Sequence, residues 1–146
     1  MKQLFATSSA LGVDISKKAL TVAKYNAQDQ KLDIKFAYSN MLSSIQQGSC
    51  FDIITANLPY VPKDMIVERD LDFEPDTALF SGNDGLDHIR QFAKELQEKN
   101  IVFRELWLEF LPEQVKSIEQ IFSSIGMVKF KKDLSGQIFF ACIRKS

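Results

Sequence analysis

The sequence predicts an α/β fold, with a mostly parallel sheet that ends in an antiparallel strand. Short apolar runs alternate with amphipathic segments along the 146 residues, and this alternation is typical of strand–helix units. Two β-rich segments, 127–132 and 137–143, close the chain and are joined through Ser135-Gly136. Strands joined so closely pair antiparallel, as a hairpin. Because the length suits one hydrophobic core, we expect residues 1–146 to form a single domain.

The first half of the chain is expected to supply three strands and one helix. The apolar run 10–14 ends on a carboxylate and predicts a buried strand. A helix over 16–27 should follow, with Ser16 as its N-cap. Apolar residues alternate over 31–38, which predicts a half-buried strand. The β-branched run 51–56 predicts a third strand.

The second half begins with a long irregular segment. Residues 61–82 show no clean period and contain two prolines and several acids, as expected of a functional or mobile loop. Asn83 or Asp84 should cap the next helix, and 101–110 should form a strand. Pro112 suits the first turn of the last helix, and Gly126 is expected to end that helix as a C′ residue.

The composition excludes several classes of protein. A hydrophobic fraction of 45% is too high for a disordered chain, and a net charge of −1 argues against a basic face for nucleic acid. Cys50 and Cys142 give neither a disulfide framework nor a metal-ligand spacing. No apolar run reaches the roughly 18–20 residues of a membrane span, and residues 1–6 are too weakly charged for a signal peptide. We therefore expect a cytoplasmic protein without a metal site.

Asn57-Leu58-Pro59-Tyr60 is the strongest local signal of chemistry. Pro59 cannot continue the strand and keeps Leu58 extended, which leaves the Leu58 carbonyl outside the regular ladder. With the Asn57 side-chain oxygen, this carbonyl offers two acceptors for a planar –NH₂ group, and Tyr60 offers a flat ring against it. The alternative is an ordinary turn in which Asn57 hydrogen-bonds its own neighbours.

Two further positions follow predicted strands. Asp14 stands where open α/β sheets bind ligands, and an acid there commonly accepts the hydroxyls of an adenosine ribose. Asn40-Met41 follows the next strand, where an adenine could lie. The alternatives are a solvent-facing carboxylate and a polar turn. His88 is expected to face solvent, with no role.

The segments Gly12-Val13-Asp14-Ile15-Ser16 and Asn57-Leu58-Pro59-Tyr60-Val61-Pro62 resemble those of class I S-adenosyl-L-methionine-dependent methyltransferases. Glu74-Pro75 … Gly82-Asn83-Asp84-Gly85 is more specific and resembles the peptide chain release factor glutamine N5-methyltransferase family. The tail is similar too, with Leu108-Glu109 … Gln114 and Lys132-Asp133-Leu134-Ser135-Gly136. The resemblance runs from about residue 10 to the end and implies a Rossmann-like methyltransferase sheet.

The resemblance also implies roles for individual residues. Asp14 would bind the ribose of S-adenosyl-L-methionine, and Asn40 and Met41 would border its adenine, with Asn57 also at the cofactor. Asn57 and the Leu58 carbonyl would bind a glutamine side-chain amide, with Pro59 fixing the turn and Tyr60 shaping the pocket. The substrate would be the glutamine of the Gly-Gly-Gln loop in a bacterial class I release factor.

The chain departs from the family pattern in three places. The family commonly has Asp where this chain has Asn40, and it usually reads Asn-Pro-Pro-Tyr where this chain has Leu58. If that position contributes mainly a carbonyl, leucine can replace proline. The family's first strand, its Asp-x-Gly-x-Gly-x-Gly loop and its N-terminal helical domain have no counterpart before Asp14. We therefore expect an N-terminally truncated family member.

Two other functions compete with this one. The same tetrapeptide resembles that of rRNA adenine dimethyltransferases, so the planar amine could be adenine N6 of rRNA or DNA. The chain could also be an inactive fragment that acts at most as a binding module, or half of a split enzyme that needs a second chain. The acidic net charge and the 74–87 segment favour the glutamine enzymes.

Overall fold

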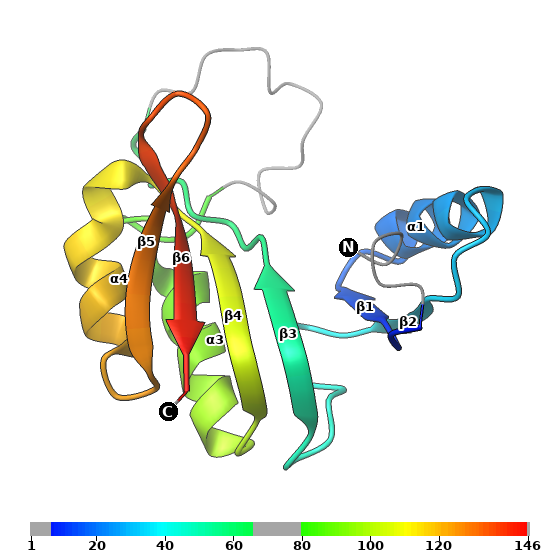
Figure 1. Cartoon of the computed structure of the whole chain (residues 1–146). Coiled ribbons are helices and arrows are strands. Elements are labelled where there is room, and N and C mark those ends of the chain that lie inside the picture. The colour runs from blue at the N-terminus through cyan, green and yellow to red at the C-terminus, as the bar shows by residue number, and fades with distance from the viewer. Residues whose placement is uncertain (1–6, 66–79, 146) are drawn as a thin grey trace. The chain divides into compact units, whose positions relative to one another are not determined.

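The computed structural model describes residues 7–65 and 80–145. They divide into two compact units, one that ends at Gln46 and one that begins at Gln47, and each unit is described by itself (Figure 1). The resemblance at Glu74-Pro75 and the acid-rich part of the predicted loop lie outside the described residues. The expectation of a single domain stays a prediction. None of the helices in the described ranges is long and apolar enough to cross a membrane.

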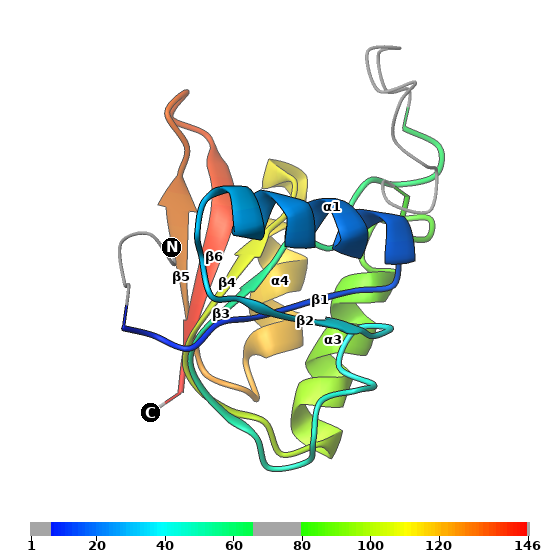
Figure 2. The same cartoon turned by 90° about the vertical axis from the view of Figure 1, so that its right-hand side faces the viewer.

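The first unit is a strand–helix–strand arrangement. β1 (Leu11–Asp14) and β2 (Lys35–Tyr38) pair in parallel, with Leu11 opposite Lys35 and Asp14 opposite Tyr38. α1 (Lys17–Asp29) connects them and packs across the pair, as Figure 2 shows. The helix buries Leu20 and Ala27, which lie seven residues apart and so on one face of it. The predicted strand–helix unit with parallel strands is confirmed here.

Both ends of α1 are set by hydrogen bonds between residues that are close in the sequence. The Ser16 hydroxyl accepts a hydrogen bond from the Ala19 amide at 3.2 Å, which confirms the predicted N-cap. At the other end, Lys31 adopts a positive φ of 54° and the Leu32 amide donates to the Ala27 carbonyl at 2.8 Å. This Schellman-type ending uses residues that the alternating pattern placed in a strand. The prediction that the strand begins at Lys31 was therefore wrong, because β2 begins only at Lys35.

The second unit is a four-stranded mixed sheet in the order β3-β4-β6-β5. β3 and β4 are parallel, whereas β6 is antiparallel to both β4 and β5. The predicted parallel sheet with an antiparallel final strand is confirmed. The elements in chain order are β3 (Cys50–Ala56), α3 (Asp87–Glu98), β4 (Val102–Glu109), η2 (Pro112–Gln114), α4 (Val115–Phe122), β5 (Met127–Lys132) and β6 (Ile138–Arg144).

The core of this unit lies between the sheet and two helices on one of its faces, α3 and α4 (Figure 1). Ile89, Ala93 and Leu96 recur at helical spacing along α3 and are buried. In the C-terminal hairpin, the ring of Phe130 stands edge-on to buried Phe110, with centroids 5.7 Å apart. The largest fully buried apolar side chains are Leu86, Ile89, Leu96, Ile101, Leu106, Leu108, Phe110, Ile118, Phe122 and Ile143.

Gly126 does not have the role that the sequence predicts. The last helix ends at Phe122 with Ser123 as its C-cap, and Gly126 is absent from the residues with positive φ. A Cβ at Gly126 would instead collide with the Arg144 carbonyl oxygen of β6. Glycine is therefore needed at this position because two backbone segments approach closely, and not because a helix ends there.

Candidate functional site

Asn57-Leu58-Pro59-Tyr60 directly follows β3, at the carboxyl end of the parallel pair β3–β4. Ala56, the last residue of β3, lies opposite Leu108, so the turn lies beside Glu109, the last residue of β4. The Tyr60 hydroxyl donates a hydrogen bond to Glu109 Oε1 at 2.9 Å. Carboxyl ends of parallel strands are where open α/β sheets bind ligands.

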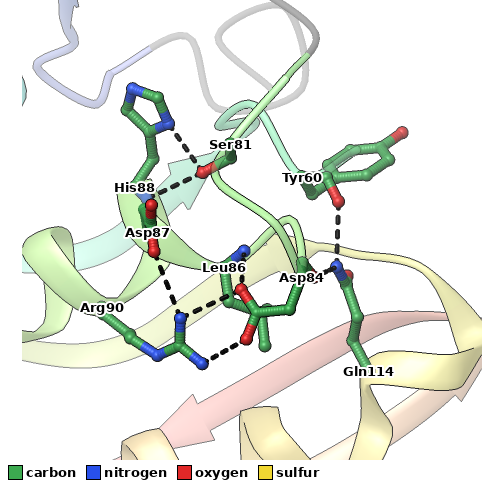
Figure 3. A network of polar contacts seen from close by, with 8 residues as sticks. All are labelled: Tyr60, Ser81, Asp84, Leu86, Asp87, His88, Arg90 and Gln114. Carbon is green, nitrogen blue, oxygen red and sulfur yellow. Dashed lines mark hydrogen bonds and ion pairs between the residues drawn. The ribbon is translucent and has the colours of Figure 1, made fainter. Parts of the chain in front are cut away.

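The backbone of Tyr60 is held as well as its ring. Gln114 Nε2 donates to the Tyr60 carbonyl at 2.9 Å, from the end of η2, as the close view of this network shows (Figure 3). Tyr60 is thus fixed at two points by residues that follow it by 49 and 54 positions in the sequence. A half-buried aromatic ring in a fixed orientation can form one wall of a pocket.

Asn57 contrasts with its neighbour Tyr60. It is exposed, and no hydrogen bond joins its side-chain amide to any other described residue. Apart from the pairing of the strands themselves, no backbone amide of a described residue donates a hydrogen bond to the Leu58 carbonyl. As far as the described residues go, these two acceptors, one amide oxygen and one carbonyl oxygen, are therefore open to the two hydrogens of a planar –NH₂ group.

A second segment runs alongside this turn. Val61 and Phe80 form an isolated parallel bridge, and the Ser81 amide donates to the Val61 carbonyl at 2.9 Å. The Lys63 amide donates to the Gly82 carbonyl at 3.0 Å. These bonds bring together two parts of the predicted loop 61–82, on either side of the residues that are not described.

Ser81 replaces the predicted cap of α3. The helix begins at Asp87, later than a cap at Asn83 or Asp84 would place it. The fully buried Ser81 hydroxyl accepts a hydrogen bond from the His88 amide at 2.8 Å and lies 2.7 Å from His88 Nδ1 (Figure 3). The expectation that His88 faces solvent was also wrong, because this contact keeps its ring half-buried.

Asp84 and Arg90 form an ion pair near the same helix end. Arg90 donates to both carboxylate oxygens of Asp84, at 3.0 and 2.5 Å, and reaches Asp87 at 3.3 Å. The Asp84 carboxylate also accepts from the Leu86 amide at 3.1 Å. The hydrogen bonds from the Arg90 guanidinium hold the pKa of Asp84 below its ordinary value; burial opposes this shift, and the Leu86 amide adds to it.

This ion pair predicts a pH-dependent contribution to stability. The folded state binds fewer protons at Asp84 than the unfolded state, so the stabilisation is present above the ordinary pKa of 3.8 and is lost as the pH falls through the lower folded value. We expect Arg90→Gln to reduce the free energy of unfolding by about 0.5 kcal/mol at neutral pH, since both side chains are about half exposed. Urea unfolding of both proteins at neutral pH and near pH 3 measures the difference.

A matched control is Lys94→Gln, which removes an exposed ion pair to Glu98 at 3.5 Å. The loss of this single, longer ion pair should reduce the free energy of unfolding less than the loss of the two-pronged Arg90–Asp84 pair. If the deficit of Arg90→Gln were as large in acid as at neutral pH, the assignment of the pH dependence to Asp84 would be wrong.

The structure brings the other predicted residues together in the first unit. The Asp14 and Asn40 positions lie at the carboxyl ends of β1 and β2, where the Ser39 amide donates to the Asp14 carbonyl at 3.1 Å. Asp14 Oδ1 accepts from the Ser16 amide at 2.6 Å. Met41 has a positive φ of 48°, and its carbonyl accepts from the buried Ser39 hydroxyl at 2.7 Å. Ser39 thus shapes the turn that carries Asn40 and Met41.

A small hollow of about 100 Å³ lies beside Asp14, between β1 and α1. Gly12 and Phe36 belong to its lining, and a Cβ at Gly12 would approach the Phe36 ring to 2.9 Å. The lining is mostly apolar, which suits packing more than metal binding. The described residues contain no cluster of three or more side chains that could hold a metal ion.

Comparison with known proteins defines the class. The family model described as "Methyltransferase domain" matches residues 1–125, so the chain belongs to this methyltransferase family. The crystal structure of the PH0226 protein from Pyrococcus horikoshii OT3 has a similar fold, with a TM-score of 0.63 and 12% identity. The alignment covers 98% of this chain and 74% of that protein. The predicted methyltransferase fold class is confirmed.

Curated relatives point to a more specific family within this class. The chain is 37% identical over 97 residues to the release factor glutamine methyltransferase of Koribacter versatilis, covering 64% of this chain and 35% of that protein. It is 32% identical over 130 residues to the enzyme of the same name from Lactococcus lactis, covering 85% and 47%. The resemblance to this family is thus confirmed, and the chain spans about half the length of such relatives, or less.

Proposed function

We propose that this chain takes part in methylating the side-chain nitrogen of glutamine in the Gly-Gly-Gln loop of a peptide chain release factor, with S-adenosyl-L-methionine as methyl donor. The observation that carries the proposal is the pair of acceptors at Asn57 and Leu58, which no described residue occupies, beside a fixed Tyr60. The names of the curated relatives support the choice of substrate. A cytoplasmic location agrees with a substrate that acts in translation.

The chemical task of the proposed site is to orient the nitrogen of the substrate amide. An amide nitrogen is a weak nucleophile because its lone pair is delocalised into the carbonyl group. If Asn57 Oδ1 and the Leu58 carbonyl each accept one N–H of the substrate amide, they hold the nitrogen in one plane and direction. Their partial negative charges also stabilise the positive charge that grows on nitrogen during methyl transfer.

The first unit offers residues that fit the proposed cofactor. One oxygen of Asp14 holds the Ser16 amide, and Oδ2 has no hydrogen-bond partner among the described residues. A carboxylate oxygen of this kind can accept ribose hydroxyls, with Asn40 and Met41 beside it for the adenine. S-adenosyl-L-methionine supplies the reactive methyl group, and this chain's residues supply the binding and placement.

The proposal includes a second polypeptide segment. No Asp-x-Gly-x-Gly-x-Gly motif occurs within these 146 residues, and backbone amides of such loops commonly hold the cofactor. We propose that a second chain, or further sequence of the same protein, contributes this loop when the site is active. The single methyltransferase domain expected for 1–146 would then be part of a larger catalytic unit.

Methyl transfer from radiolabelled S-adenosyl-L-methionine to a purified class I release factor tests the proposal directly. The chain should be assayed alone and with the N-terminal half of a full-length relative. Label is expected on the wild-type release factor and not on a variant with Gly-Gly-Glu in the loop. Label on rRNA alone would favour the alternative function, methylation of adenine N6. Absence of transfer under both conditions would support an inactive fragment and contradict the proposed function.

A further inference from the structure

Gln114 is a buried amide whose hydrogen-bonding groups are all used. Its side chain is 6% exposed. Nε2 donates to the Tyr60 carbonyl and to the Asp84 carbonyl, both at 2.9 Å, and Oε1 accepts from the Leu111 amide at 2.9 Å. Figure 3 shows Nε2 between the two loops, with the Tyr60 ring pointing away from it. The side chain therefore joins three backbone segments that are far apart in sequence.

These partners require an amide at position 114. Two of them are carbonyl oxygens, which only accept, and the third is an N–H group, which only donates. A carboxylate would keep the bond from Leu111 but would place negative charge against both carbonyls. A methionine of similar size would leave all three groups without a partner. The arrangement thus depends on two N–H donors and one acceptor in a single side chain.

Gly85 leaves the space that this contact needs. A Cβ at Gly85 would collide with the Tyr60 carbonyl oxygen and would lie 2.6 Å from Gln114 Nε2. The backbone around Asp84 therefore lies directly against the Tyr60 carbonyl, with the Gln114 amide beside both. No water-sized gap separates these groups, so a displacement at Gln114 would be transmitted to Tyr60.

We propose that Gln114 is a positioning residue for the two acceptors at Asn57 and Leu58. It does not touch the substrate. It fixes the Tyr60 carbonyl, while Glu109 fixes the Tyr60 hydroxyl, and the rigid Pro59 between Tyr60 and Leu58 carries this restraint to the Leu58 carbonyl and Asn57. This inference rests on the proposed function, because it concerns the orientation of the acceptors for a substrate amide.

Gln114→Glu tests the inference. In the folded variant, we expect backbone ¹⁵N order parameters to fall at Asn57, Leu58 and Tyr60 and to stay unchanged in α4. With a release factor as substrate, kcat should fall about 100-fold, the effect of a misplacement of roughly 1 Å, while KM stays within about twofold. Lower pH should restore part of kcat, since a protonated carboxyl regains one donor.

The matched control is Gln97→Glu, the same exchange at an exposed amide that donates to Ser124 Oγ at 3.0 Å. This variant should leave both the order parameters and kcat unchanged. If Gln114→Glu does not fold, Gln114→Met removes the donors without adding charge. In the wild-type chain, slow exchange of both Gln114 side-chain amide hydrogens supports the inference, and rapid exchange contradicts it without any variant.

The outcomes separate the two proposals. If the wild-type protein transfers no methyl group to a release factor, the proposed function fails, and the order parameters alone decide the role of Gln114. If residues 57–60 keep their order in a folded Gln114→Glu protein, the positioning role is overturned, whatever the activity. Loss of order at 57–60 with an unchanged kcat would overturn it as well.

Discussion

Replacing Asn57 by alanine is expected to lower kcat for glutamine methylation by about 100- to 1000-fold, the usual effect of removing one preorganised polar contact to the transition state. The fold should be unaffected, with a change in the free energy of unfolding within about 0.5 kcal/mol. The reason is the same for both expectations. Asn57 is exposed and its side chain bonds no other described residue, so its polar atoms are available to a substrate and its replacement breaks no hydrogen bond among those residues.

Two variants make this result specific. Asn57→Asp keeps an acceptor oxygen and should retain more activity than Asn57→Ala. Asn26→Ala replaces an exposed asparagine of α1 and is the control for a generic loss of a surface amide. The measurements are release factor methylation at saturating substrate and urea unfolding. Equal kcat for Asn57→Ala and wild type would exclude Asn57 from the proposed chemistry.

The largest expected loss of stability comes from Gly85→Ala. Gly85 has a φ of +75°, where an L-residue costs roughly 1–2 kcal/mol. The added Cβ would also collide with the Tyr60 carbonyl and crowd Gln114. We expect a total loss of about 3 kcal/mol or more, the range of overpacked sites plus backbone strain. Thermal and urea unfolding measure this loss.

Gly48→Ala separates the two causes of that loss. Gly48 has the same φ of +75° and lies in the same unit, but a Cβ there would meet nothing within 4 Å. Its substitution should cost only roughly 1–2 kcal/mol, the strain of the backbone alone. If both alanine variants lost equal stability, the crowding of a Cβ at position 85 against Tyr60 would contribute nothing to the loss.

Local patterns in the sequence predicted most of the fold. The Ser16 cap, Pro112 at the first position of η2 and the hairpin through Ser135-Gly136 depend on near neighbours, and the structure confirms each of them. The parallel pairing of β3 with β4 followed from the alternation of strands and helices. The Asn57–Tyr60 turn could be predicted because asparagine and proline at the end of a strand indicate a turn without any knowledge of tertiary contacts.

The parts that the sequence could not predict depend on distant contacts. Gln114 looks like an ordinary polar residue after Pro112, and only the fold brings it to Tyr60, 54 positions away. Ser81 caps α3 through an amide seven residues further on, beyond the usual capping distance. Gly126 had a reasonable local explanation, whereas the structure shows that strand β6 requires it. Such roles have no periodicity or short spacing by which they could be recognised.

The contacts of Val61 with Phe80 and Ser81, and of Lys63 with Gly82, close the stretch between them into a ring. The entropy of closing a ring depends only weakly on its length, at roughly 0.6 kcal/mol for each doubling. Insertions or deletions between these anchor points would therefore change little in the fold or in the setting of Asn57.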